Sequence, residues 1–179
     1  MQAVKMVVTG PFAAGKTQFI KTISEIDVVS TERKISSAAE RVKEATTVAM
    51  DFGRITIDDD LVLYLFGTPG QKRFDFMWEI LSEGMLGFIV VVDSARPETF
   101  REARSILDTF RGYASTPYIV AANKQDHEDA WPPEDLRIAL KIDGAIKVMP
   151  CVASDKESVK NTLLELLYSI LERMDSEPS

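Results

Sequence analysis

The sequence predicts a doubly wound α/β fold, with a mostly parallel six-stranded sheet, one antiparallel hairpin strand and helices on both faces. Apolar runs typical of buried parallel strands alternate along the chain with segments that repeat their apolar residues at helical spacing. A glycine-containing loop stands between the first strand and the first helix, where α/β proteins often bind phosphate. Three later strands are followed by polar motifs, at Gly67–Gln71, Asn123–Asp126 and Cys151–Ser154. Ligands of such sheets bind at the carboxyl ends of strands.

The first half of the chain is predicted to hold three strands and one helix. The polar stretch Ser24–Thr46 is interpreted mostly as a long loop, with a helical piece around Ala38–Ala45 as an alternative. Asp58–Asp60 supplies a solvated hairpin turn. In chain order we expect strand Ala3–Thr9, helix Gln18–Ile23, strand Thr46–Ile57 and strand Leu61–Phe66.

The second half is predicted to alternate helices and strands up to a terminal helix. Pro97 and Pro132 open two of the helices, because proline is tolerated in a first helical turn. In chain order we expect helix Arg73–Ser82, strand Gly87–Asp93, helix Pro97–Arg111, strand Pro117–Ala122, helix Pro132–Leu140, strand Ala145–Cys151 and helix Glu157–Met174.

Length and charge limit the classes of function. With 179 residues, 45% of them apolar, we expect one domain over 1–174 and a short disordered tail over 175–179. The net charge of −7 argues against a nucleic-acid partner, because that footprint needs a basic patch. The single cysteine, Cys151, excludes an internal disulfide and favours a reducing, cytoplasmic compartment. We see no membrane-length apolar run and no lipidation signal, so we expect no direct membrane insertion.

The loop Gly10–Thr17 has the pattern G-x-x-x-x-G-K-T between a strand and a helix, which predicts a phosphate-binding loop. Its backbone N–H groups and the start of the following helix would surround an anion. Lys16 would reach the outer phosphates, and the Thr17 hydroxyl would ligate Mg²⁺. The candidate nucleotide-binding residues of this part are Gly10, Phe12, Ala13, Ala14, Gly15, Lys16, Thr17 and Gln18.

The tetrapeptide Asn123-Lys124-Gln125-Asp126 ends a buried strand and predicts a guanine-binding loop. A carboxylate at Asp126 would accept two parallel hydrogen bonds from the N1–H and amino group of guanine, a donor pair that adenine lacks. Lys124 would lay its stem along the base, and Asn123 would tie this loop to the phosphate loop.

These motifs and their order resemble those of the small Ras-like GTPases over nearly the whole chain. Gly10–Thr17 matches the first motif of that family and Gly67–Gln71 its third motif. The run Leu65–Gln71 is similar to a bacterial branch of MglA-like and roadblock-associated GTPases. The resemblance implies a P-loop GTPase that switches between GTP and GDP with Mg²⁺, with a roadblock/LC7-type protein as regulator or scaffold. It also implies roles for further residues: Gln71, Lys16 and Thr47 in hydrolysis, Gly70 at the phosphates, Thr47 at the metal, and Val152, Ala153 and Ser154 at the base, where the Ala153 amide would meet the guanine oxygen.

Two departures from the family pattern bear on the chemistry. The position that holds an aspartate in most relatives, near Mg²⁺, is Gly67 here. We hypothesise that Asp51 on the neighbouring strand replaces it; the alternative is that Asp51 is an exposed strand acid. Phe12 and Ala13 stand where two glycines are common, and Phe12 would crowd the γ-phosphate, so we expect slow hydrolysis that a partner accelerates.

Two other functions compete with a regulatory GTPase. One is an interaction module that binds guanine nucleotide and hydrolyses it negligibly, which Phe12 and Gly67 favour. The other is a P-loop kinase or ATPase, which would not need Asp126 and which we place far behind.

Overall fold

A computed structural model describes residues 2–35, 46–70 and 75–176 of the chain. Its sheet has the strand order β2-β3-β4-β1-β5-β6-β7, in which β3 alone runs antiparallel to its neighbours. The doubly wound sheet with one antiparallel strand is therefore confirmed. The strands are β1 (Gln2–Thr9), β2 (Val29–Ile35), β3 (Thr46–Asp58), β4 (Leu61–Gly67), β5 (Gly87–Asp93), β6 (Tyr118–Asn123) and β7 (Val148–Pro150).

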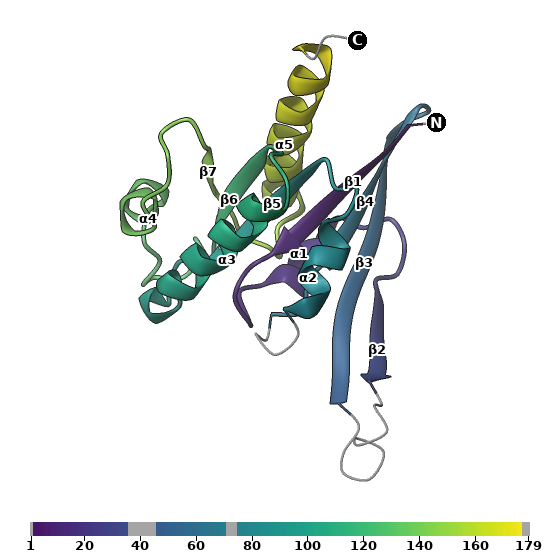
Figure 1. Cartoon of the computed structure of the whole chain (residues 1–179). Helices are drawn as coiled ribbons and strands as arrows, with labels where there is room; N and C mark the ends of the chain where they lie inside the picture. The colour runs from purple at the N-terminus through teal and green to yellow at the C-terminus, as the bar shows by residue number, and fades with distance from the viewer. Residues whose placement is uncertain (1, 36–45, 71–74, 177–179) are drawn as a thin grey trace.

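The edge strand β2 is a seventh strand, beyond the six that we expected, and it corrects the prediction of a loop over Ser24–Thr46. It pairs with β3 from Val29 opposite Phe52 to Ile35 opposite Thr46, and this hairpin runs past the end of β1 in Figure 1. Charged residues broke the apolar alternation that marks a strand, but an edge strand accepts charge. The alternative helical piece at 38–45 lies outside the described residues.

The helices are α1 (Lys16–Ile23), α2 (Phe76–Ser82), α3 (Phe100–Tyr113), α4 (Pro133–Ala139) and α5 (Lys156–Ser176). Pro97 opens a short 3₁₀ turn, η3 (Pro97–Thr99), ahead of α3 rather than α3 itself. The last strand is shorter than predicted, because Asp143 accepts hydrogen bonds from the amides of Ala145 and Ile146 and so holds a turn before β7. Helix α5 runs two residues past its predicted end at Met174.

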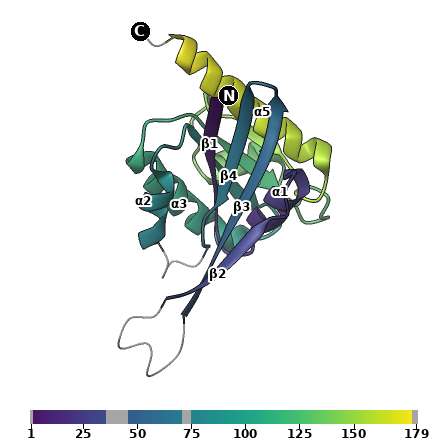
Figure 2. The same cartoon turned by 90° about the vertical axis from the view of Figure 1, so that its right-hand side faces the viewer.

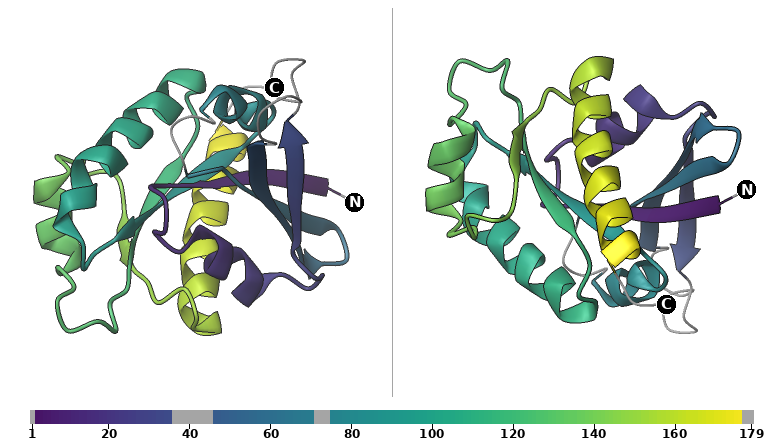
Figure 3. Two further views of the ribbon diagram at one scale, coloured as in Figure 1. Left: turned by 90° about the horizontal axis from the view of Figure 1, so that it is seen from below. Right: turned by 90° about the horizontal axis from the view of Figure 1, so that it is seen from above.

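Helices cover both faces of the sheet. One apolar core packs α1 and α5 against β1, β4 and β6, and a second packs α2, α3 and α4 against β5 and β6. Figure 2 shows α2 and α3 on one side of the sheet and α5 on the other, and the end-on views of Figure 3 agree. Strands β1, β4, β6 and β7 are parallel, so the four predicted motifs that follow them meet at one edge of the sheet.

Candidate nucleotide-binding site

The phosphate loop leaves β1 at Thr9 and enters α1 at Lys16. Gly10 has φ +144°, and a Cβ there would lie 2.2 Å from the Val91 carbonyl oxygen, so the turn needs glycine. Gly15, with φ +110°, precedes the first turn of α1, which no side chain caps. The first amides of α1 therefore remain available to an anion.

Lys16 lies within this loop and is 7% exposed. Its ammonium donates to the carbonyl oxygens of Gly10 at 2.7 Å and Pro11 at 2.8 Å. Burial lowers the pKa of Lys16 to about 8, although the nearby charges of Asp51 and Glu102 act to raise it. A buried cation at this point gains most from a ligand that brings negative charge.

A cavity of about 410 Å³ opens beside the loop. The third-motif loop closes one side: a Cβ on Gly70 would lie 2.7 Å from Phe12 Cα and 2.9 Å from Lys16 Nζ. The Trp78 indole fixes that loop by donating to the Pro69 carbonyl oxygen at 3.0 Å. The Phe12 side chain also lines the cavity but is 63% exposed. The lining includes Lys21, which we did not predict, and also Thr68 and Pro69, which belong to the predicted motif Gly67–Gln71 but were not singled out as nucleotide-binding residues.

The side chain of Asp51 lies between the first and third motifs. Asp51 pairs with Gly67 across the β3–β4 ladder, and a Cβ on Gly67 would lie 3.1 Å from Asp51 Cβ. The Thr17 hydroxyl donates to Asp51 Oδ2 at 2.5 Å. Asp51 is 9% exposed, so the alternative of an exposed strand acid is wrong.

This pair fits a magnesium ion chemically. A hydroxyl that donates its proton to a carboxylate keeps its lone pairs for a cation, and Mg²⁺ is usually held by few protein oxygens together with phosphates and water. Among the described residues no group of three histidine, cysteine or acidic side chains gathers, so Thr17 and Asp51 are the described side chains that we consider for a metal ion here.

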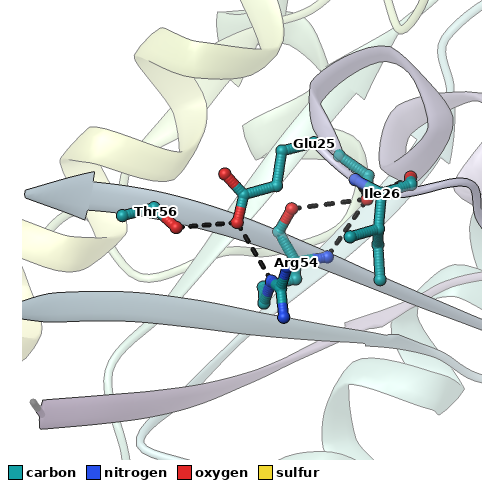
Figure 4. A network of polar contacts seen from close by, with 5 residues as sticks. Glu25, Ile26, Arg54 and Thr56 are labelled. Atoms are coloured by element: carbon teal, nitrogen blue, oxygen red, sulfur yellow. Dashed lines mark hydrogen bonds and ion pairs between the residues drawn. The ribbon is translucent and has the colours of Figure 1, made fainter.

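A polar network fixes β3 against the end of α1 and so helps to set the position of Asp51 (Figure 4). Ser24 Oγ accepts from the Arg54 amide at 3.1 Å, and the Glu25 amide donates to the Arg54 carbonyl at 2.8 Å. Glu25 also accepts from the Arg54 guanidinium at 3.0 Å and from the Thr56 hydroxyl at 2.7 Å. These hydrogen bonds lower the pKa of Glu25, with the Thr56 hydroxyl as the largest cause.

A second cavity, of about 170 Å³, adjoins the first, and Gly15 and Gln18 line both. Its remaining lining residues all belong to the predicted base-binding set: Asn123, Lys124, Asp126, Val152, Ala153 and Ser154. The exposed Asp126 carboxylate keeps its acceptor positions for a ligand or water. The structure therefore brings the predicted base residues together beside the phosphate cavity.

Asn123 connects the base loops to the phosphate loop, as predicted. Its Nδ2 donates to the Ala14 carbonyl oxygen at 2.9 Å, and its Oδ1 accepts from the Ala153 amide at 2.9 Å. The Ala153 amide, which we expected at the guanine oxygen, is thus already bonded. It would reach a base only by sharing its proton with Asn123.

Two predicted catalytic residues are not tested by these contacts. Gln71 lies outside the described residues, and Thr47 is described only as part of β3, opposite Lys34 of β2. None of the described helices is long and apolar enough to cross a membrane.

Comparisons with known proteins find one family model and several relatives that match most of the chain. A family model described as "conserved hypothetical ATP binding protein" matches residues 26–173. The chain is 32% identical over 126 residues to the uncharacterized protein MJ1339 of Methanocaldococcus jannaschii, covering 70% of this chain and 73% of the relative. It is 29% identical to the Ras-related protein RABD2a of Arabidopsis thaliana, covering 75% and 69%, and 26% identical to the human ADP-ribosylation factor-like protein 4C, covering 98% and 91%. Proteins named as Ras-related and as ADP-ribosylation-factor-like are thus similar to most of this chain.

Proposed function

The chain belongs to the family described as conserved hypothetical ATP binding proteins, and we propose that within it this protein is a regulatory GTPase that hydrolyses GTP slowly. The observation that carries the proposal is the pair of adjoining cavities. The buried Lys16 lines one and Asp126 lines the other, and Gly15 and Gln18 line both. A nucleoside triphosphate carries negative charge at one end and a purine at the other, which is the complement of this arrangement.

Guanine is proposed over adenine although the family description names ATP. Asp126 offers two acceptor oxygens, and guanine presents two adjacent donors where adenine presents none. Sites that bond a donor pair discriminate strongly against an analogue that lacks it, by up to about 10⁴- to 10⁵-fold.

Competition against a fluorescent GDP tests this preference. We expect unlabelled GDP and GTP to displace it at concentrations at least about 100-fold lower than ADP and ATP, well within the range of such sites. Chromatography of the nucleotide released on denaturing the purified protein gives an independent measure of base and phosphate count. ADP or ATP competing within tenfold of the guanine nucleotides would refute the guanine site and favour the ATP-binding function.

Mg²⁺ is proposed to lie at Thr17 and Asp51, with Thr47 as a further ligand by resemblance. Asp51 would do from β3 what an aspartate at position 67 does in relatives, since its carboxylate already bonds the Thr17 hydroxyl. Bound Mg²⁺ would neutralise phosphate charge. The Asp51 carboxylate would orient the Thr17 hydroxyl, and Lys16 would stabilise charge on the outer phosphates.

Slow hydrolysis is proposed from Phe12 at the phosphate cavity. Gln71 would orient the attacking water, and unassisted relatives of this kind turn over at about 10⁻⁴ to 10⁻³ s⁻¹. The MglA-like branch, the cytoplasmic location and a roadblock/LC7-type regulator are proposed from resemblance alone. Such a partner would add about 10³- to 10⁵-fold if it supplied or positioned an arginine.

The same Phe12 favours the second candidate, an interaction module that binds guanine nucleotide without turning it over. Multiple-turnover phosphate release separates the two. A GTPase gives release that exceeds one phosphate per protein and that Phe12→Gly accelerates, whereas release that stays below one equivalent in both proteins, with and without a roadblock-type partner, supports the module.

A further inference from the structure

The loop after β7 is held against the base cavity by side chains from elsewhere in the chain. Both polar backbone groups of Ala153 are bonded: Asn123 Oδ1 accepts from its amide at 2.9 Å, and the Thr22 hydroxyl of α1 donates to its carbonyl oxygen at 2.5 Å. The Val152 amide donates to Ser158 Oγ of α5 at 2.8 Å. The wall of the base cavity is thus attached at three points.

Thr22 makes an unusual bond for a threonine inside a helix. Such a hydroxyl ordinarily bonds the carbonyl one turn earlier on its own helix, as Thr109 does to Ser105 at 2.9 Å. Thr22 instead donates its single proton to Ala153, 131 residues away in the sequence. The Thr22 hydroxyl therefore joins α1 to the loop after β7 rather than stabilising its own helix.

The Thr22 bond is also linked to the cavities through Gln18. Gln18 lies one helical turn before Thr22, on the same side of α1, and its Nε2 donates to Thr22 Oγ1 at 3.0 Å. Gln18 is also one of the residues that line both cavities. The hydroxyl therefore accepts from one wall of the nucleotide site and donates to the other.

These hydrogen bonds form a closed ring that joins the phosphate loop and α1 to the two loops of the base cavity. Asn123 Nδ2 bonds the Ala14 carbonyl in the phosphate loop, and Asn123 Oδ1 bonds Ala153, which returns to α1 through Thr22. Within this ring, α1 reaches the base loop through a side chain at Thr22. Loss of that bond would leave a partly buried carbonyl without its partner and would release the loop on the side of α1.

We propose that Thr22 is a positioning residue for the purine, which it serves by holding Ala153 and its neighbours at the base cavity; this rests on the proposed guanine-nucleotide function. Thr22 itself need not touch the nucleotide. Because GDP and GTP share the same base, removing the Thr22 bond should weaken the binding of both by the same factor. A nucleotide that the loop does not recognise is affected less.

The test is Thr22→Val, which keeps the shape of the side chain and removes the hydroxyl. We expect the dissociation rate of fluorescent GDP and of fluorescent GTP to rise by the same factor, about 10-fold, as for one lost hydrogen bond. We expect ADP affinity to stay within about twofold, so that the ratio of GDP to ADP affinity falls. Thr22→Ser, which restores a hydroxyl, should return the GDP rate to within about threefold of the original.

Thr109→Val is the matched control, since it makes the same change on α3 and removes a local bond only. An unchanged GDP rate in Thr22→Val, or an equal fall of GDP and ADP affinity, would overturn the proposal. If Thr22→Val does not fold, as judged by its circular dichroism melting curve, Thr22→Ala takes its place under the same criteria. Absence of a preference for GDP over ADP in the unsubstituted protein would instead be a failure of the proposed function.

Discussion

Asp51 and Gly67 face each other across the β3–β4 pairing, so exchanging them should preserve Mg²⁺ binding that either single substitution impairs. Asp51→Ala removes the carboxylate that accepts from the Thr17 hydroxyl at 2.5 Å. Loss of a residue that orients a metal ligand costs about 10- to 100-fold in metal affinity. We expect Asp51→Ala to raise the Mg²⁺ concentration needed to retain bound GDP by that factor.

The single change Gly67→Asp should also impair binding, for a different reason. Its Cβ would lie 2.9 Å from Ile20 Cδ1, 3.1 Å from Asp51 Cβ and 3.4 Å from Asp51 Oδ2. The new carboxylate would meet that of Asp51, and two carboxylates so close do not both ionise readily.

In the exchange Asp51→Gly with Gly67→Asp, the Asp51 side chain is gone and only the flexible end of Ile20 must move. The pair of positions 51 and 67 would then again hold one carboxylate, now on β4 instead of β3. We expect the double variant to retain GDP at a lower Mg²⁺ concentration than Asp51→Ala does, and so to recover part or all of the loss of about 10- to 100-fold.

The measurement is the release of fluorescent GDP as Mg²⁺ is titrated from EDTA-treated buffer into the millimolar range. Asp59→Ala, in the exposed β3–β4 turn, controls for removal of an acid of the same hairpin. The reasoning is refuted if Asp51→Ala retains GDP at the original Mg²⁺ concentration, or if the exchange variant is no better than the two single variants.

Three further predictions concern the pKa of Lys16, the backbone angle of Ala13 and the hydrogen bond of Trp78. Because the pKa of buried Lys16 is lowered to about 8, while bound phosphates favour its charged form, nucleotide binding takes up a proton; affinity should fall about 10-fold between pH 7 and pH 9, and calorimetry in buffers of different ionisation enthalpy should detect the uptake. A pH-independent affinity would contradict this. Ala13 has φ +64°, so Ala13→Gly should raise the free energy of unfolding by about 1 kcal/mol or less, measured by urea denaturation; a loss would show that the strain is absent. Trp78→Phe removes the donor to the Pro69 carbonyl and should lower the free energy of unfolding by about 1–3 kcal/mol in the same assay, and an unchanged midpoint would refute that anchor.

The elements that the sequence predicted best are fully buried ones, because burial requires an unbroken run of apolar residues. Strand β5 has the predicted bounds Gly87–Asp93, and every one of its residues is buried. Strand β2 was missed because an edge strand gains its stability from backbone pairing with β3, which charged side chains do not reveal. The short β7 reflects the turn at Asp143, whose bonds depend on local geometry rather than composition.

The site divides in the same way. Residues that end parallel strands could be grouped from the sequence, because the topology brings those ends together, and Asn123 indeed bridges to Ala14. The engagement of the Ala153 amide and the part of Thr22 could not be predicted, since they depend on how α1 and the last loop rotate toward each other. The sequence left open whether Asp51 is an exposed strand acid, and its burial and its bond to Thr17 exclude that alternative. A role for Asp51 at a metal ion stays a prediction.

The place of Asp51 opposite Gly67 also affects how other chains should be searched. A scan that requires an acid at position 67 would pass over this chain, although the Asp51 carboxylate of the adjacent strand lies 3.4 Å from where a Cβ at position 67 would stand. Homologues with glycine there should therefore be inspected in three dimensions. If evolution moved the aspartate between positions 51 and 67, both positions would have to change together, or an intermediate with weaker Mg²⁺ binding would have to exist.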